Sequence, residues 1–161
     1  MLVALYIGNH SGDTLLVQLW WFLTRLVQRG EFARVTHVEA ILDTLPDGTV
    51  VIASSSLRDG GVRIKAAHLD PAHWLIVDFP AWDADAAREW FAQHVGEPYD
   101  WRGALATVLP GKNASRRWFC NEAVGAAVGL RSPAAFGPAQ FAAICFTFGR
   151  DVTAEFFTER A

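Results

Sequence analysis

The chain has 161 residues, about half of them apolar, and its 14 basic and 17 acidic side chains give a formal net charge of −3. This length predicts a single domain over residues 1–161, in which roughly 70% of the unfolded surface becomes buried. The charge balance excludes a dominant basic patch, so nucleic acid is not an expected partner. The two cysteines lie in very different sequence contexts and do not indicate a disulfide scaffold.

The first residues, Met1–Ile7, are apolar but lack the cationic start of an export signal, and Gly8 follows them. We therefore expect a strand there and no signal peptide. A cap at Asp13 or Thr14 predicts a helix to about Gln28 with a wide apolar face. Polar residues interrupt the apolar run of this helix, so it is too short to cross a bilayer and no transmembrane segment is expected.

Four further segments have the apolar and β-branched residues, bounded by turn residues, that are typical of strands. They are Thr36–Leu42, Val50–Ser55, Val62–Ala66 and Trp74–Phe79. The turn sequence Leu45–Thr49 joins the first two, which predicts an antiparallel hairpin.

The second half of the chain is predicted to be mainly helical. Asp83 should cap a helix that ends near His94, and residues 97–117 should form a long polar loop. A small-residue helix over Ala123–Val128 and a short helix over Ala139–Ile144 are expected to follow.

Cys120 precedes the small-residue helix, so its thiol should lie at the first helical turn. Unpaired backbone N–H groups and the helix dipole favour a thiolate at such a position, which would make Cys120 a nucleophile. A small buried side chain is the alternative interpretation. Cys145, which lies in the apolar sequence Ala-Ala-Ile-Cys-Phe, fits that alternative better.

A cysteine nucleophile needs a base that is near in space, and five histidines compete for this role. Only His37 is predicted to lie in a strand, where it is either a base or a hydrogen-bonded core residue. Glu39 should share a face with His37, because side chains alternate along a strand, and it could orient the imidazole. An exposed strand face with two polar residues is the alternative.

Three segments resemble the NlpC-type cell-wall peptidases. The run Gly96–Gly103, which leads to Phe119-Cys120-Asn121-Glu122, resembles the family's Gly-x-Pro-Tyr-x-Trp-Gly sequence and its nucleophile turn. Thr36–Leu42 resembles the strand that carries the base, and Val51–Ser56 with the Gly-Val pair at residues 61–62 resembles the next strand and its exit. Ordinary members have the cysteine segment first, so the reversed order here resembles the circularly permuted branch.

This resemblance implies an α+β fold that is papain-like and circularly permuted, with an antiparallel sheet packed against a helix carrying the cysteine. It implies Cys120 as nucleophile and His37 as base, without a metal or a cofactor. Tyr99 matches a family tyrosine whose hydroxyl helps to stabilise the oxyanion, and a buried structural role is equally consistent with it. Asn121 stands beside the nucleophile where the family usually has serine, and with Tyr99 it is expected to belong to the oxyanion or substrate-binding site.

The third catalytic residue departs from the family pattern, because Ile52 occupies the expected position. Isoleucine cannot orient an imidazole. Glu39 is our first candidate for this role, and Ser54 or Ser55 after a shift in register is the alternative.

The expected function is hydrolysis of an amide or peptide bond, and the resemblance implies peptidoglycan stem peptides or another small amide as substrate. An acyltransferase, a thioester or lipid-ester hydrolase, and a non-catalytic binding module of this fold are the alternatives. Because no signal peptide is expected, we predict a cytoplasmic or phage-associated protein.

Overall fold

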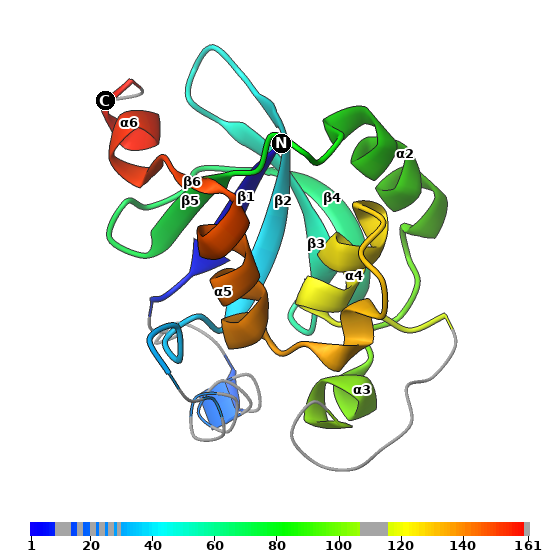
Figure 1. The fold of residues 1–161 in the computed structure, drawn as a ribbon. Coiled ribbons are helices and arrows are strands. Elements are labelled where there is room, and N and C mark those ends of the chain that lie inside the picture. Colours follow the sequence, from blue (N-terminus) through cyan, green and yellow to red (C-terminus); the bar gives the residue numbers. More distant parts are fainter. Residues whose placement is uncertain are drawn as a thin grey trace.

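A sheet of six antiparallel strands forms the centre of the molecule, in the order β4-β3-β2-β1-β5-β6 (Figure 1). The computed structural model describes residues 1–8, 30–106 and 116–159, and positions 14, 15, 18, 19, 22, 25 and 28. The strands are β1 (Leu2–Tyr6), β2 (His37–Thr44), β3 (Val50–Ser56), β4 (Gly61–Ala67), β5 (Trp74–Asp78) and β6 (Arg150–Asp151). The helices are α2 (Ala84–His94), α3 (Trp101–Ala106), α4 (Cys120–Ala127), α5 (Pro138–Phe148) and α6 (Thr153–Thr158), with a 3₁₀ turn η1 (Pro133–Ala135).

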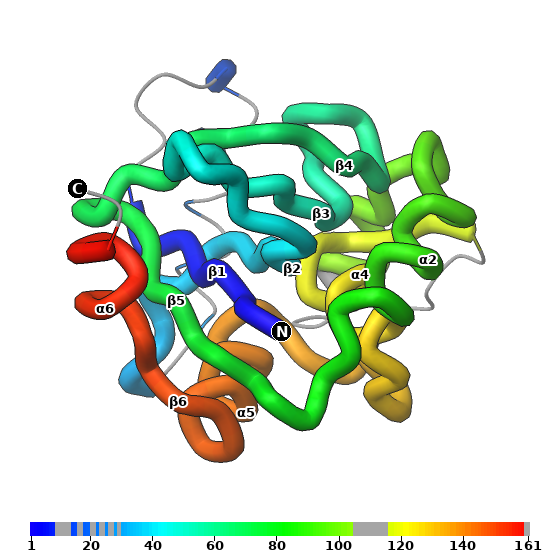
Figure 2. The backbone as a smooth tube through the Cα atoms, turned by 90° about the horizontal axis from the view of Figure 1, so that it is seen from above, coloured from blue at the N-terminus to red at the C-terminus, as the bar shows by residue number. Residues whose placement is uncertain are grey.

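The two faces of the sheet are buried by different helices. Val38, Ala40 and Leu42 of β2 belong to the main core, which α2, α4 and α5 complete on one side of the curved sheet (Figure 2). The other face holds a smaller apolar cluster, in which Phe156 of α6 packs with Ile41 of β2. The predicted α+β class, an antiparallel sheet with helices packed against it, is confirmed.

Strands β2 and β3 separate at the end of the sheet that carries His37. Their ladder runs from Ala40↔Ala53 to Thr44↔Val50 and stops short of His37 among the described residues. The start of α4 is held at this end, because the Ser54 hydroxyl donates to the Cys120 carbonyl at 3.4 Å. The fold thereby brings the ends of β2 and α4 together, although they are far apart in sequence.

The predicted strands and the helix capped by Asp83 agree with the structure to within one or two residues at each end. The prediction of a continuous loop over residues 97–117 was wrong, because α3 forms within it. The Asp100 carboxylate accepts the Gly103 N–H at 2.9 Å and so caps the first turn of α3. The helix predicted to end at Ile144 continues to Phe148, and Gly149 follows it.

The helix predicted over residues 13–28 lies largely outside the described residues. Those that are described within it are helical at positions 15, 18, 19, 22 and 25. Leu15, Leu19 and Phe22 have helical spacing and are 84, 54 and 62% exposed, so this part of the apolar face meets solvent. No helix in the described ranges combines the length and the apolar character needed to cross a bilayer.

Candidate active site

Cys120 is the first residue of α4 and is buried, with 4% of its surface exposed. Phe119 before it is extended, and the carboxylate of Glu122, three residues further on, accepts the Phe119 N–H at 3.4 Å. An acidic side chain at this position interacts favourably with the helix dipole and helps to fix where the helix begins. The Cys120 sulfur is thereby held at the N-terminal end of α4.

The segment that leads into Cys120 is held by backbone pairing to the start of β4. Gly61 forms a bridge with Pro98, and Tyr99 forms a second bridge with Trp118. On the other side, the Ser55 hydroxyl donates to the Trp118 carbonyl at 2.6 Å. The chain therefore approaches the cysteine along a path fixed by β3 and β4.

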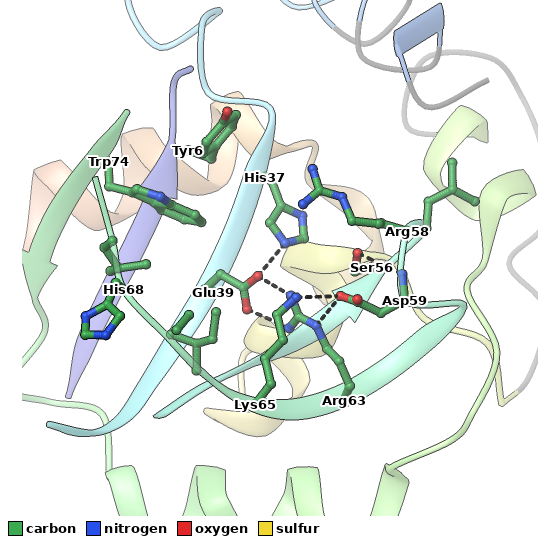
Figure 3. Close-up of a pocket in the computed structure, with 14 residues that line it drawn as sticks. Tyr6, His37, Glu39, Ser56, Arg58, Asp59, Arg63, Lys65, His68 and Trp74 are labelled. Atoms are coloured by element: carbon green, nitrogen blue, oxygen red, sulfur yellow. Dashed lines mark hydrogen bonds and ion pairs between the residues drawn. The ribbon is translucent and has the colours of Figure 1, made fainter. Parts of the chain in front are cut away.

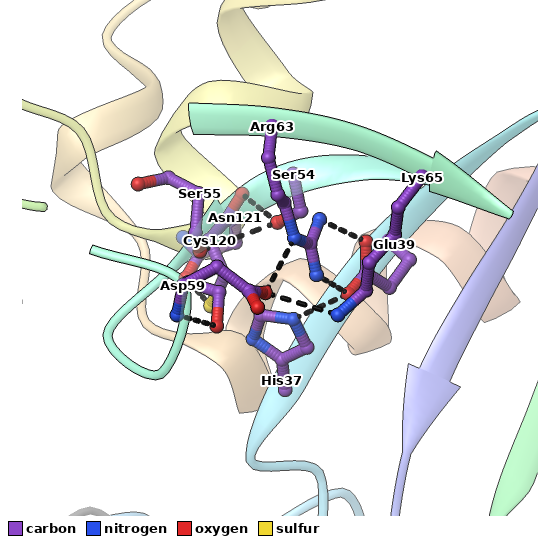
Figure 4. A network of polar contacts seen from close by, with 10 residues as sticks. His37, Glu39, Ser54, Ser55, Asp59, Arg63, Lys65, Cys120 and Asn121 are labelled. Carbon is purple, nitrogen blue, oxygen red and sulfur yellow. Dashed lines mark hydrogen bonds and ion pairs between the residues drawn. The ribbon is translucent and has the colours of Figure 1, made fainter. Parts of the chain in front are cut away.

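His37 is the first residue of β2 and pairs with Tyr6 of β1. Its Nε2 lies 2.7 Å from Oε1 of Glu39, and the ring also makes a hydrogen bond with the Cys120 side chain. Figure 4 shows the other ring nitrogen, Nδ1, turned toward the Cys120 sulfur. Burial alone would lower the pKa of His37, but the Glu39 charge and the hydrogen bonds with Cys120 and Glu39 raise it to about 9.

Glu39 is 2% exposed and lies between two cationic side chains. In addition to His37, it binds the guanidinium of Arg63 on β4 through both carboxylate oxygens, with Nη1 2.6 Å from Oε2 (Figure 4). Burial alone would raise the pKa of Glu39, but Arg63 and His37 lower it to about 2. The carboxylate is therefore ionised and fixed in position at neutral pH.

The ion-pair network continues from Arg63 to two further residues. Asp59, in the β3–β4 turn, accepts from Arg63 Nε at 2.8 Å and from Lys65 Nζ at 3.0 Å. Sequence reasoning missed Arg63 and Asp59. One signal was available in the sequence. Arg63 and Lys65 stand at alternate positions of one strand, so their side chains share a face of the sheet, the face that also carries Glu39 of the β2–β3 hairpin.

The alternatives for the third residue occupy other positions. Ile52 pairs with Ile41 and lies in the smaller apolar cluster. The hydroxyls of Ser54 and Ser55 donate to backbone carbonyls of the nucleophile segment. Of the candidates named from the sequence, Glu39 is the one for which the structure gives a side-chain hydrogen bond to His37.

Tyr99 and Asn121 both lie near the nucleophile. Tyr99 is 8% exposed, and its backbone bridges to Trp118. The Asn121 amide donates to the Phe136 carbonyl at 2.6 Å, while its Oδ1 accepts the Cys120 thiol at 3.7 Å. The Asn121 side chain therefore helps to position the cysteine, and its amide nitrogen is already bonded to the Phe136 carbonyl.

A groove of about 250 Å³ opens beside His37, on the sheet face opposite α4. We call it the sheet groove (Figure 3). Basic side chains from the β3–β4 turn and β4 line one side, and Tyr6 and Trp74 line the other (Figure 3). Leu69 is also among the lining residues. Cys120 is not among its lining residues, whereas His37 and Glu39 are.

Within the described residues, no three His, Cys, Asp or Glu side chains gather in a group that could hold a metal ion. The site brings the Cys120 thiol and the Glu39 carboxylate to the same imidazole, that of His37. We found no match to this chain among protein-family models, curated proteins or solved structures.

Proposed function

We propose that the protein is a cysteine hydrolase of the circularly permuted, papain-like NlpC type, which cleaves an amide or peptide bond. One observation carries the proposal: the thiol of Cys120, at a helix N-terminus, contacts the imidazole of His37, whose far nitrogen binds the ionised Glu39. Nucleophile, base and orienting carboxylate in this order are what acyl transfer through a thiolate requires.

The reaction follows from these contacts. His37, as an imidazolium, holds the proton that the Cys120 thiol has lost, and the Cys120 sulfur attacks the carbonyl carbon of the substrate to form a tetrahedral intermediate. The imidazolium then returns the proton to the leaving amine, which departs and leaves an acyl-enzyme. His37 next removes a proton from water, whose oxygen attacks the acyl carbon. The imidazolium then returns this proton to the departing sulfur, which releases the acid and restores the thiol and the neutral imidazole.

Glu39 keeps the imidazole in the orientation that this cycle needs and stabilises its protonated form. The raised pKa of His37 favours an imidazolium next to the sulfur at neutral pH. The developing oxyanion would face the backbone N–H of Cys120 at the start of α4, with the Tyr99 hydroxyl assisting.

The substrate assignment depends on the resemblance of the three sequence segments to cell-wall peptidases. It favours peptidoglycan stem peptides, either from recycled wall fragments in the cytoplasm or from the wall itself when the protein is part of a phage particle.

The test is hydrolysis of purified peptidoglycan peptides, followed by mass spectrometry, with Cys120→Ala and Cys145→Ala compared. We expect Cys120→Ala to abolish cleavage and Cys145→Ala to retain it, because Cys145 is fully buried and burial raises its pKa to about 12. Native protein treated with iodoacetamide at neutral pH should be modified at Cys120 and spared at Cys145.

The opposite pattern in variants with matched circular dichroism spectra would overturn Cys120 as nucleophile. Slow alkylation together with absent cleavage would identify a binding module that has kept the arrangement without the activity.

A second candidate is transfer or hydrolysis of an acyl ester of a lipid on the same Cys-His pair. The observation in its favour is the apolar helix face at Leu15, Leu19 and Phe22, which is exposed as a lipid-binding segment would be. Release of fatty acid from phosphatidylcholine vesicles, lost in Leu19→Ser with peptide cleavage absent, would favour this candidate.

A further inference from the structure

Exposed apolar side chains gather beyond the end of the sheet at which β2 begins. Leu15, Leu19 and Phe22 occupy one face of the helical segment before β2, and each is more than half exposed. Trp101, the first residue of α3, is 46% exposed. Figure 1 shows α3 and the blue helix of the first segment at this same end of the sheet. Single exposed apolar residues are common, but several on one surface mark a place where an apolar partner binds.

The exposed charged side chains at this end are mainly basic. They are Arg25 and Arg34 before β2, Arg58 in the β3–β4 turn, Arg102 of α3, and Arg116 and Arg117 before α4. Among the described residues of these segments, Glu31 and Asp59 are the exposed acidic ones, and Asp59 is paired with Arg63 and Lys65. The end of the sheet that carries the candidate site is therefore positively charged.

The opposite end of the sheet carries the reverse charge. Its exposed acidic residues include Asp43, Asp47, Asp83, Asp85, Asp151 and Glu155, against the basic Arg88 and Arg150. The whole chain has a net charge of −3, so its charge is polarised along the strands, with the positive pole at the end of His37 and Cys120. A negatively charged surface would attract this protein and turn that end toward itself.

The surface of an anionic lipid bilayer matches both properties of this end. Its acyl chains suit the apolar helix face, and its phosphates suit the arginines. Trp101 combines the two, because the guanidinium carbon of Arg102 lies 5.0 Å from the centre of its ring. An exposed tryptophan beside a cation is suited to the depth of the lipid headgroups, where one part of the ring is in contact with apolar groups and another with water.

We propose that the protein binds to the surface of an anionic phospholipid bilayer through the end of the sheet that carries His37 and Cys120. Leu15, Leu19 and Phe22 insert at the boundary between headgroups and acyl chains, and the arginines contact the phosphates. The inference does not depend on which bond is cleaved. It states where the protein works, and it places the Cys-His pair next to the membrane.

Sedimentation of the full chain with lipid vesicles measures this binding without turnover. Vesicles of phosphatidylcholine, with and without phosphatidylglycerol, differ in their negative charge. We expect binding to be roughly tenfold tighter or more when phosphatidylglycerol is present, and to weaken as salt is added, because salt screens the attraction between the arginines and the phosphates.

Variants at the two ends identify the surface that binds. Leu19→Ser and Phe22→Ser should each weaken binding roughly fivefold or more, because each removes an apolar side chain from the lipid. Phe148→Ser is the matched control, since Phe148 is 70% exposed, close to the 62% of Phe22, but ends α5 at the opposite end. Arg102→Gln should weaken binding roughly fivefold, whereas Arg150→Gln, the same change of charge on β6, should leave it unchanged.

Equal binding to both kinds of vesicle would overturn the proposal, and so would controls that weaken binding as much as the variants at the candidate-site end, in proteins with matched circular dichroism spectra. Light scattering that shows a dimer lost in Phe22→Ser, without vesicle binding, would also overturn it, because this surface would then join two copies of the chain. Cys120→Ala should bind vesicles as wild type does. A protein that binds vesicles but hydrolyses nothing would therefore remove only the proposed function.

Discussion

Glu39 is the residue on which the candidate site depends most, because two cations share its carboxylate. Arg63 takes both of its oxygens, and His37 binds one of them as well. A buried charge is costly unless it is paired, so this carboxylate requires the partners that also fix its position. Its effect on His37 can be separated from its effect on folding.

Replacing Glu39 by Gln tests the orienting role. The amide can still accept a hydrogen bond from His37, but it stabilises the imidazolium less, so we expect kcat to fall about tenfold or more. His37→Ala should abolish activity. Asp43→Asn, the same acid-to-amide change on the same strand, is the control and should leave kcat unchanged. Wild-type kcat/KM in Glu39→Gln would exclude Glu39 as the orienting residue.

The raised pKa of His37 also predicts how stability depends on pH. Because the pKa rises from 6.5 to about 9 on folding, the stabilisation is complete below pH 6.5 and is lost as pH rises through about 9. Wild type should therefore be more stable than His37→Gln by up to about 3 kcal/mol below pH 6.5, and this advantage should shrink toward pH 10.

Urea unfolding of both proteins across this pH range gives the difference directly. His68→Gln, which removes an exposed histidine, is the control for the loss of an imidazole elsewhere in the protein. A constant difference between wild type and His37→Gln from pH 6 to 10 would contradict the coupling of His37 to Glu39.

At the scale of elements, β4 contributes to the site although no residue of β4 contacts Cys120 in the described interactions. It supplies Arg63 to Glu39, and its first residue pairs with the segment that leads to the nucleophile. Two substitutions on β4 separate these contributions.

Arg63→Met removes the guanidinium that binds both oxygens of Glu39, so this buried carboxylate loses one of its partners. We expect a loss of roughly 3–5 kcal/mol in the free energy of unfolding. The double variant Arg63→Met, Glu39→Gln should recover part of this stability, because the buried negative charge that Arg63 neutralised is also removed. It should recover no activity, because the carboxylate that orients His37 is missing. Lys65→Met, at a more exposed position, should cost less than about 1 kcal/mol. A double variant no more stable than Arg63→Met would contradict the role of Arg63 in stabilising the buried charge of Glu39.

Gly61 tests the pairing of β4 with the nucleophile segment. A Cβ at Gly61 would lie 2.0 Å from the Glu97 carbonyl oxygen, whereas one at Gly60 would meet nothing within 4 Å. We expect Gly61→Ala to cost about 3 kcal/mol and to reduce kcat, because the segment must move. Gly60→Ala should cost only about 1 kcal/mol, from its positive φ of 82°. Equal effects in urea unfolding and activity would show that the bridge does not position Cys120.

For the whole molecule, the sequence predicts local structure better than it predicts contacts between distant segments. Apolar and β-branched runs bounded by turn residues locate β2 and β3, and Asp83 marks the start of α2, because these signals are local. The helix α3 was missed, since its cap at Asp100 lies in a segment with Gly103 in the first turn, and glycine disfavours helices.

The candidate site shows the same division. His37 and Glu39 can be paired from the sequence because they are two residues apart on one strand. The contact of His37 with Cys120 followed from a resemblance, not from periodicity. Arg63 and Asp59 were missed, because Arg63 reaches Glu39 from β4 across β3 to β2, and this contact depends on the strand order of the sheet.

The position of β4 at the edge of the sheet has one more consequence. An edge strand presents unpaired backbone groups that can recruit a strand from another molecule, and proteins commonly prevent this with charged side chains on the edge. Arg63 and Lys65 provide such charges on β4, and backbone contacts with Gly96 and Glu97 cover its start. We expect these charges to discourage the addition of a foreign strand at β4, so Arg63 and Lys65 would serve the edge of the sheet as well as the ion-pair network around Glu39.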